Sequence, residues 1–169
     1  MSSKILHFYG GGQDDGGRTL DEILGWPDAE LEAVHDFIQW LFPLPERSGA
    51  NPSAPVLDGT TIDAFRGSTD LQQRLRRSFL RMLRFYGFEY QEGIVQQAVN
   101  FSARSVNWLG PGNHNHLRLT RMLRSLRLLG LASESAALYQ VLSKIYRSHS
   151  DRITQRTYQF WTNAAALNE

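Results

Sequence analysis

Apolar residues recur at intervals of three and four positions along much of the chain, and this spacing constrains the fold more than any other feature. An α-helix has about 3.6 residues per turn, so residues with this spacing share one face. One such run contains Leu71, Leu75, Phe79, Met82 and Tyr86. No alternating pattern long enough for a half-buried strand competes with these runs. The spacing therefore predicts an all-α fold, a single compact domain of about six to eight helices.

Glycine, proline and capping residues divide the chain into the predicted helices. Thr19 with Glu22, and Thr69 with Gln72, have the spacing of a capping box, in which side chains satisfy the first backbone N–H groups of a helix. Thr60 is predicted to cap the third helix, Asn113 or Asn115 the sixth, and Ser150 or Asp151 the last. The predicted helices span residues 19–24, 27–41, 60–66, 69–86, 101–109, 113–129, 133–145 and 151–164.

Two segments lack a helical pattern. Residues 1–18 contain the run GGGQDDGG and are predicted as a flexible, glycine-rich segment after a short ordered start. The stretch from Phe42 to Gly59 contains four prolines and is predicted as a long surface connection. The residues before it have too few apolar positions for a core of their own, so residues 19–169 are predicted as one helical domain.

Composition excludes several classes of protein. The chain has 169 residues, of which 41% are hydrophobic and 21% are charged, which is typical of a globular domain. It contains no cysteine, so disulfides, thiolate zinc sites and a cysteine nucleophile are excluded. No stretch approaches the roughly 18 apolar residues of a membrane span, and no secretory signal is visible. We therefore expect a cytoplasmic protein with no membrane span.

Charge is distributed unevenly along the chain. Residues 1–65 hold three basic and eleven acidic side chains, whereas residues 66–127 hold eleven basic and three acidic ones. The arginines recur at helical spacing in two rows. The first arginine row is Arg74, Arg77, Arg81 and Arg84, and the second is Arg118, Arg121, Arg124 and Arg127.

The two arginine rows have two interpretations. Arg74, Arg77, Arg81, Arg84, Arg124 and Arg127 are predicted as a surface for an anionic partner, which includes nucleic acid or an acidic protein. The alternatives are a solvated face, or a basic surface that the acidic N-terminal third covers. No base-stacking or groove-reading motif accompanies the arginines.

The patterns that usually carry chemistry are missing. His114 and His116 diverge on a helix because they are two positions apart, and no carboxylates cluster with them, so no metal is expected. The adjacent His35 and Asp36 do not have the spacing of a catalytic dyad on a helix. The glycine run lacks the phosphate-binding signatures, and no nucleophile elbow exists. We predict no catalytic residues and no cofactor.

Three blocks of sequence resemble a known family. They are HDFIQWLFP from His35 to Pro43, followed by Asn51-Pro52 and Ala54-Pro55, then RMLRFYG from Arg81 to Gly87, and NHNHLRLTRMLRSLRLLG from Asn113 to Gly130. In this order they resemble the conserved domain of the opioid growth factor receptor, over most of the chain. The chain is similar to the short, single-domain microbial members. The resemblance implies a helical domain, and in the animal proteins a nuclear-associated receptor for an enkephalin peptide that restrains growth.

We therefore predict a non-enzymatic binding or regulatory domain with an anionic or peptide-like partner. The alternatives are a nucleic-acid-associated protein that uses the arginine rows, and an enzyme with an unrecognised site. Candidate ligand-binding residues come mainly from the polar positions of the blocks: His35, Asp36, Gln39, Trp40, Trp108, Asn113, His114, Asn115, Arg118 and Arg121. These residues form either a buried structural network or an open ligand site.

Overall fold

The computed structural model describes residues 3–166, and the chain divides into two compact units, Met1–Ser78 and Phe79–Glu169. The boundary between the units falls within helix α6, Thr69–Tyr86. The predicted N-terminal segment and the predicted domain each include terminal residues, 1–2 and 167–169, that lie outside the described part of the chain. The predicted domain therefore contains parts of both units.

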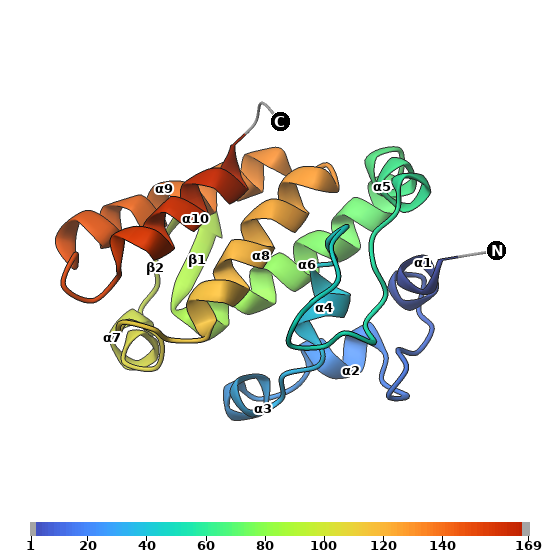
Figure 1. The fold of residues 1–169 in the computed structure, drawn as a ribbon, viewed down its shortest axis with the longest axis horizontal. Helices are drawn as coiled ribbons and strands as arrows, with labels where there is room; N and C mark the ends of the chain where they lie inside the picture. The colour runs from blue at the N-terminus through green and yellow to red at the C-terminus, as the bar shows by residue number, and fades with distance from the viewer. Residues whose placement is uncertain (1–2, 167–169) are drawn as a thin grey trace. The chain divides into compact units, whose positions relative to one another are not determined.

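Helices account for most of the described chain, as the spacing predicts (Figure 1). The first unit contains α1 Lys4–Tyr9, α2 Leu20–Leu24, α3 Asp28–Ala33, α4 Ile38–Leu41, α5 Gly59–Arg66 and the first part of α6. The second contains the rest of α6, β1 Phe88–Gln91, β2 Ile94–Gln97, α7 Phe101–Ser105, α8 Asn115–Leu128, α9 Ala132–Ser148 and α10 Gln155–Ala165. The described residues thus form ten helices, more than the six to eight predicted, and several are short.

Helix α1 lies within the segment predicted as flexible, and its apolar face belongs to the core of the first unit. Ser3 caps it by accepting hydrogen bonds from the first free N–H groups. The Tyr9 hydroxyl donates to the Leu41 carbonyl at 2.6 Å and lies 2.9 Å from the Ser78 hydroxyl. Burial raises the pKa of Tyr9, against the opposing effect of the Ser78 hydrogen bond. These contacts fix the start of the chain within the first unit.

The helix predicted over residues 27–41 is wrong as one element, because the structure breaks it into α3 and α4. Val34 between them is extended, with φ −92° and ψ 132°. Phe37 to Phe42 are all buried, and a straight helix on a surface would expose one side of such a run. The break turns α4 so that the core surrounds it.

Four predicted helix starts are also wrong, whereas the cap of Thr19 and Glu22 is confirmed at α2. At α6 the Ser68 hydroxyl, not that of Thr69, accepts the Leu71 N–H at 3.1 Å, and the Gln72 side chain donates to the carbonyls of Phe65 and Arg66. At α8 the residue in the capping position is His114, neither Asn113 nor Asn115.

Helix α5 begins after Asp58, not Thr60, because the Asp58 carboxylate accepts the Thr61 N–H at 2.8 Å. Hydrogen bonds from Thr61 lower the pKa of that carboxyl group. Helix α10 begins after Thr154, which accepts the N–H of Thr157, rather than at residues 150–151.

A β-hairpin in the second unit departs from the predicted all-α fold. Strands β1 and β2 pair antiparallel, with Gln91 opposite Ile94. The turn between them consists of Glu92 and Gly93, with φ values of 51° and 81°. Positive φ at both turn positions matches the twist of a tight hairpin, and the glycine at the second position adopts it readily. Four-residue strands are too short to produce a clear alternating pattern, so the helical spacing around them dominates the sequence.

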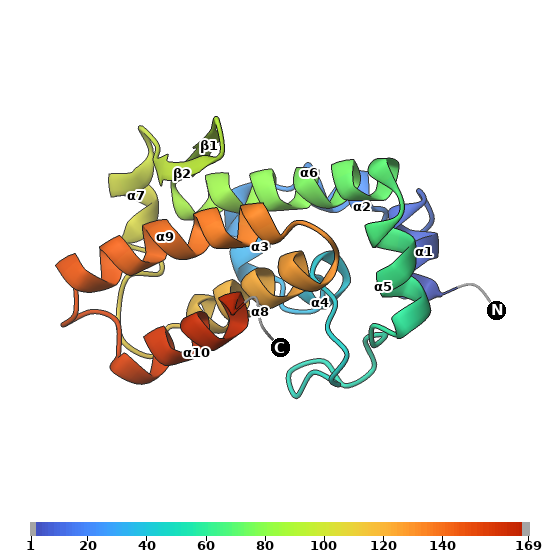
Figure 2. The ribbon, with the colours of Figure 1, turned by 90° about the horizontal axis from the view of Figure 1, so that it is seen from above.

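Helices α8, α9 and α10 pack side by side in the second unit, and β2 lies against α9 (Figures 1 and 2). Their contact faces are apolar and fully or almost fully buried, and include Leu119, Met122, Leu126, Leu138, Leu142, Ile145 and Trp161. Gly87 ends α6 with φ 91°, and a Cβ there would lie 2.7 Å from the Phe101 Cα. Only glycine allows this turn and this approach.

Replacing Tyr9 with phenylalanine tests whether α1 is part of the folded core. The Tyr9→Phe variant leaves the buried Leu41 carbonyl and Ser78 hydroxyl short of a partner, which costs about 1–3 kcal/mol in the free energy of unfolding. Urea denaturation followed by circular dichroism measures it. Tyr90→Phe, at a half-buried position, is the control. Equal stability of the Tyr9→Phe variant and the wild type would contradict the assignment.

Candidate functional site

Several candidate residues of the second unit form a hydrogen-bonded network in its core. The Trp108 indole N–H donates to the Tyr86 carbonyl at 3.0 Å, and the Trp161 indole N–H donates to the His116 carbonyl at 3.1 Å. The Tyr86 hydroxyl donates to the Asn115 side chain at 3.3 Å. Trp108, Trp161 and Asn115 are completely buried. In this network, residues of the block from Asn113 to Gly130 contribute to the packing of α6, α8 and α10.

The asparagines before α8 shape the start of that helix. The Asn113 side chain accepts the Asn115 N–H at 2.9 Å and donates to the Asn107 carbonyl at 2.9 Å. His114 between them is exposed. Asn113 and Asn115 thus fix the loop that precedes α8, whereas the side chain of His114 faces solvent.

His116 lies at the centre of this network, although it was not among the predicted site residues. Its Nε2 lies 2.8 Å from the Trp108 carbonyl, which can only accept, so Nε2 carries the proton in the neutral ring. Its Nδ1 is buried and has no hydrogen-bond partner within the described part of the chain. Trp108 and Trp161 contact the ring edge-to-face. Burial lowers the pKa of His116 despite the hydrogen bond to Trp108, and the charge of His114 acts in the same direction as burial.

The two arginine rows are largely turned toward the protein. The buried members are Arg81, Arg118 and Arg127, the half-buried ones are Arg74, Arg121 and Arg124, and the exposed ones are Arg77 and Arg84. Helical spacing predicts that arginines share a face but does not tell whether that face is outward. The predicted anionic-partner surface is therefore less exposed than its spacing suggests.

Several of these arginines have defined partners. The Arg127 Nε donates to the Ala164 carbonyl at 2.9 Å, which ties α8 to the end of α10. Arg74 donates to the Tyr9 carbonyl at 3.1 Å. Arg77 pairs with Asp21 at 2.8 Å, so one residue of the acidic N-terminal third does meet the first arginine row.

Two of the four candidate residues of the first unit, Asp36 and Trp40, line a small polar cavity of about 200 Å³. The Asn51 amide donates to the Gln39 side chain at 3.3 Å and to the Asp36 carbonyl at 3.4 Å. Trp40 is buried in the wall of this cavity, and Gln39 donates to the His35 carbonyl. The block HDFIQWLFP and the later Asn51 therefore meet, as their joint presence in the signature suggests.

Arg18 holds this cavity together. Its guanidinium donates to the Asp14 carboxylate at 2.8 Å and to the Asp36 carboxylate at 2.9 Å. The Asp14 carboxylate also accepts the N–H groups of Gly16 and Arg18, and its side chain is fully buried. Burial opposes the charge of Arg18, but its hydrogen bonds to the two aspartates outweigh this and raise its pKa. The polar groups of the cavity thus largely satisfy one another.

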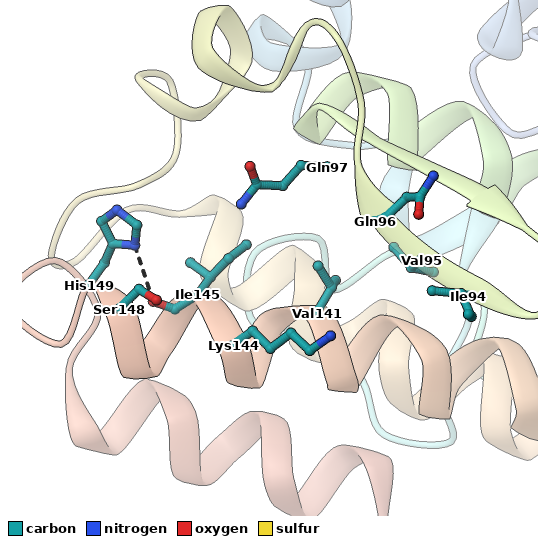
Figure 3. Close-up of a pocket in the computed structure, with 9 residues that line it drawn as sticks. All are labelled: Ile94, Val95, Gln96, Gln97, Val141, Lys144, Ile145, Ser148 and His149. Carbon is teal, nitrogen blue, oxygen red and sulfur yellow. Dashed lines mark hydrogen bonds between the residues drawn. The ribbon is translucent and has the colours of Figure 1, made fainter.

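A second cavity, of about 280 Å³, lies in the second unit between β2 and α9, and sequence reasoning missed it. Figure 3 shows Val141 and Ile145 pointing from α9 toward β2, with Gln97 extending over them. We call it the β2–α9 groove. Its lining residues are Ile94, Val95, Gln96, Gln97, Val141, Lys144, Ile145, Ser148 and His149.

The β2–α9 groove has an apolar floor and a polar rim. Val95, Val141 and Ile145 are at most 5% exposed and form the floor, whereas Ile94 at its end is 58% exposed. The rim carries Lys144 and the two glutamine side chains. His149 donates from Nδ1 to the Ile145 carbonyl at 3.3 Å, because that oxygen can only accept, and this leaves Nε2 as the acceptor of the neutral ring (Figure 3). In the sequence, the isoleucine directly after the Glu92-Gly93 turn is the signal that could have pointed to this groove.

Within residues 3–166, no three histidine, aspartate or glutamate side chains gather in a way that could hold a metal ion. The groove lining contains no carboxylate, and its polar side chains besides the two glutamines are Lys144, Ser148 and His149, of which His149 bonds to the Ile145 carbonyl. What this arrangement offers chemically is apolar contact, hydrogen bonding and a positive charge.

Comparison with known proteins identifies the family. A family model described as the opioid growth factor receptor (OGFr) conserved region matches residues 17–168. The chain belongs to the OGFr conserved-region family. The sequence resemblance stated from the three blocks is thereby confirmed.

The OGFr relatives are much longer than the shared region. Rat opioid growth factor receptor is 41% identical over 131 residues, which cover 75% of this chain and 22% of the relative. The human receptor is 40% identical, covering 72% of this chain and 19% of the relative. Rat opioid growth factor receptor-like protein 1 is 36% identical, covering 75% and 28%. The chain thus spans about a fifth to a quarter of these relatives, and no solved structure matches it.

The buried His116 predicts a dependence of stability on pH. Its pKa is lower in the folded chain than in the unfolded chain, where histidine has a pKa of about 6.5. The unfolded state therefore binds the proton first as the pH falls below that value, and the free energy of unfolding decreases until the folded pKa is reached. Urea denaturation from pH 7.5 to 5 measures this loss.

Two variants isolate the contribution of His116. His116→Gln keeps a donor for the Trp108 carbonyl and removes the titrating ring, so its stability should fall less over the same pH range. His35→Gln replaces an exposed histidine that does not contribute to the shift of the His116 pKa, and should retain the wild-type slope. A His116→Gln variant with an unchanged slope would assign the pH dependence to another group.

Adjacent aspartates in the glycine-rich loop should differ in their effect on stability. Asp14→Asn removes the charge from a buried carboxylate that holds Arg18, and should cost about 1–3 kcal/mol in the free energy of unfolding. Asp15→Asn breaks an exposed pair with Lys4 and should cost less than about 1 kcal/mol. Thermal and urea denaturation compare them, and equal losses would show that the Asp14 pair does not organise the loop.

Proposed function

We propose that this OGFr-family domain is a non-enzymatic binding domain that holds a peptide-like partner in the β2–α9 groove. One observation carries the proposal: in this groove an apolar floor, an exposed isoleucine and polar rim groups lie together in a cavity of about 280 Å³. Ligand sites in proteins typically combine apolar walls with a few well-placed polar groups. The rat and human relatives are named opioid growth factor receptor, and a receptor is a binding protein, which supports the same class.

The other candidate surfaces offer less to a partner. In the polar cavity of the first unit, Arg18, Asp36 and Asn51 are already engaged with protein groups. Of the eight arginines in the two rows, Arg77 and Arg84 are exposed, and Arg77 pairs with Asp21, so few guanidinium groups are open to phosphate. Nucleic-acid binding through these rows and an enzymatic role stay the alternatives that the sequence left open, and neither is favoured by a specific feature of the structure.

Ile94→Asp tests the proposal without disturbing the core. Phage displaying random dodecapeptides are selected on the full wild-type chain, and the enriched clones are then measured against variants. A charge in place of the exposed Ile94 side chain should weaken peptide binding by at least about tenfold. This corresponds to the loss of one aliphatic side chain that the bound peptide would bury. Circular dichroism checks that the variant remains folded.

The matched control is Leu117→Asp, because Leu117 is 68% exposed, lies on α8 in the same unit and does not line the groove. Clones should bind this variant as tightly as the wild type. If the enriched clones bind Ile94→Asp with unchanged affinity, or lose binding equally to both variants, the groove is not the ligand site. Failure to enrich any clone also counts against a peptide-binding role.

A further inference from the structure

The β2–α9 groove is lined by residues whose spacing and charge specify more than a general apolar contact. We infer that its ligand is an extended segment of a partner protein that has apolar side chains at alternate positions and a carboxylate flanking them. This inference rests on the proposed function, and three features of the groove carry it.

The first feature is the spacing of the floor. Val141 and Ile145 are one helical turn apart on α9, which separates them by about 6 Å along the helix axis. Alternate residues of an extended chain lie about 6.6 Å apart on one face. A strand-like segment that runs along α9 therefore places every second side chain over a floor residue. The four residues of β2, Ile94–Gln97, border one end of the groove, where they can align the segment with α9 (Figure 3).

The second feature is the outer edge of β2. Ala98 N–H donates to the Gly87 carbonyl at 2.9 Å, and the tight turn pairs Gln91 with Ile94. Antiparallel strands alternate bonded and non-bonded pairs, so Gln97, opposite Phe88, directs its backbone N–H and C=O away from β1.

Gln97 is exposed and lines the groove, so a segment in the groove can approach its backbone N–H and C=O. Its side-chain amide, like that of Gln96, can also both donate to and accept from a peptide backbone. Pairing along a strand edge gives affinity, and side-chain pockets then select the sequence. These groups favour a peptide over a ligand without a hydrogen-bonding backbone.

The third feature is charge. The groove lining contains Lys144 and His149 but no aspartate or glutamate. Lys144 is exposed and lies beside the floor residue Ile145, so its ammonium group is within reach of a side chain that flanks the apolar positions. Positive charge on one side favours a carboxylate on the other and disfavours a partner lysine.

Three blocked pentapeptides test the inference by titration into the full chain, followed through backbone amide chemical shifts. The probe is Ac-Glu-Leu-Thr-Leu-Glu-NH2, whose two carboxylates serve either chain direction. The analogues replace both glutamates with glutamine or with lysine. The glutamate peptide should shift the amides of residues 94–97 and 141–149, and should bind about three- to fivefold more tightly than the glutamine peptide, as expected for one exposed ion pair.

Lys144→Gln should abolish this preference for glutamate over glutamine, whereas Arg152→Gln, at another exposed basic position in the same unit, should preserve it. Equal binding of the glutamate and glutamine peptides to the wild type would overturn the inference. So would tighter binding of the lysine peptide, a preference that survives Lys144→Gln, or shifts confined to residues outside the groove.

The two proposals fail separately. If phage-selected peptides depend on Ile94 but lack acidic residues and ignore Lys144, the groove binds peptides and only the acidic specificity is wrong. If selected peptides bind independently of Ile94, the proposed function itself is wrong.

Discussion

The second unit depends on the burial of His116 between two tryptophans. Its ring meets the Trp108 carbonyl, and its own carbonyl accepts the Trp161 indole N–H. These two bonds connect the loop before α8, α8 itself and α10 in one chain of contacts. A buried polar group is costly unless it is paired, so this connection fixes one arrangement of the three segments. Helix α9 packs against both α8 and α10, and β2 packs against α9. The groove lies between β2 and α9, and α9 in turn packs on the two helices that His116 connects.

Much of the helical structure could be predicted from the sequence, because the spacing of apolar residues within a short window indicates a helix. The α2 capping box and the buried stripe of α6 are examples in which one short window contains the whole signal. The hairpin could not be predicted in the same way, since four residues per strand are too few for a period. The broken helix at Val34 depends on how deeply Phe37 to Phe42 are buried, which spacing alone does not reveal.

The candidate site shows a similar division. The signature blocks pointed to residues that do lie together, such as Asp36, Gln39 and Asn51, but these bonds hold the fold of the first unit. The arginine spacing predicted shared faces, yet the direction of a face depends on which neighbours pack against it. The groove joins residues 94–97 to residues 141–149, and no local pattern links two segments so far apart. None of its residues belongs to a recognisable sequence motif, and the fold brings an apolar floor, a strand edge and a lysine together.

Intermolecular nuclear Overhauser effects test most directly whether the groove is where a partner binds. The full chain, with its isoleucine and valine methyl groups labelled, would be studied with a phage-selected peptide. The account predicts contacts from the peptide to the methyl groups of Ile94, Val141 and Ile145, with alternate peptide side chains contacting the two α9 residues. Contacts only to methyl groups outside the groove, such as those of Val99 or Val106, would contradict it.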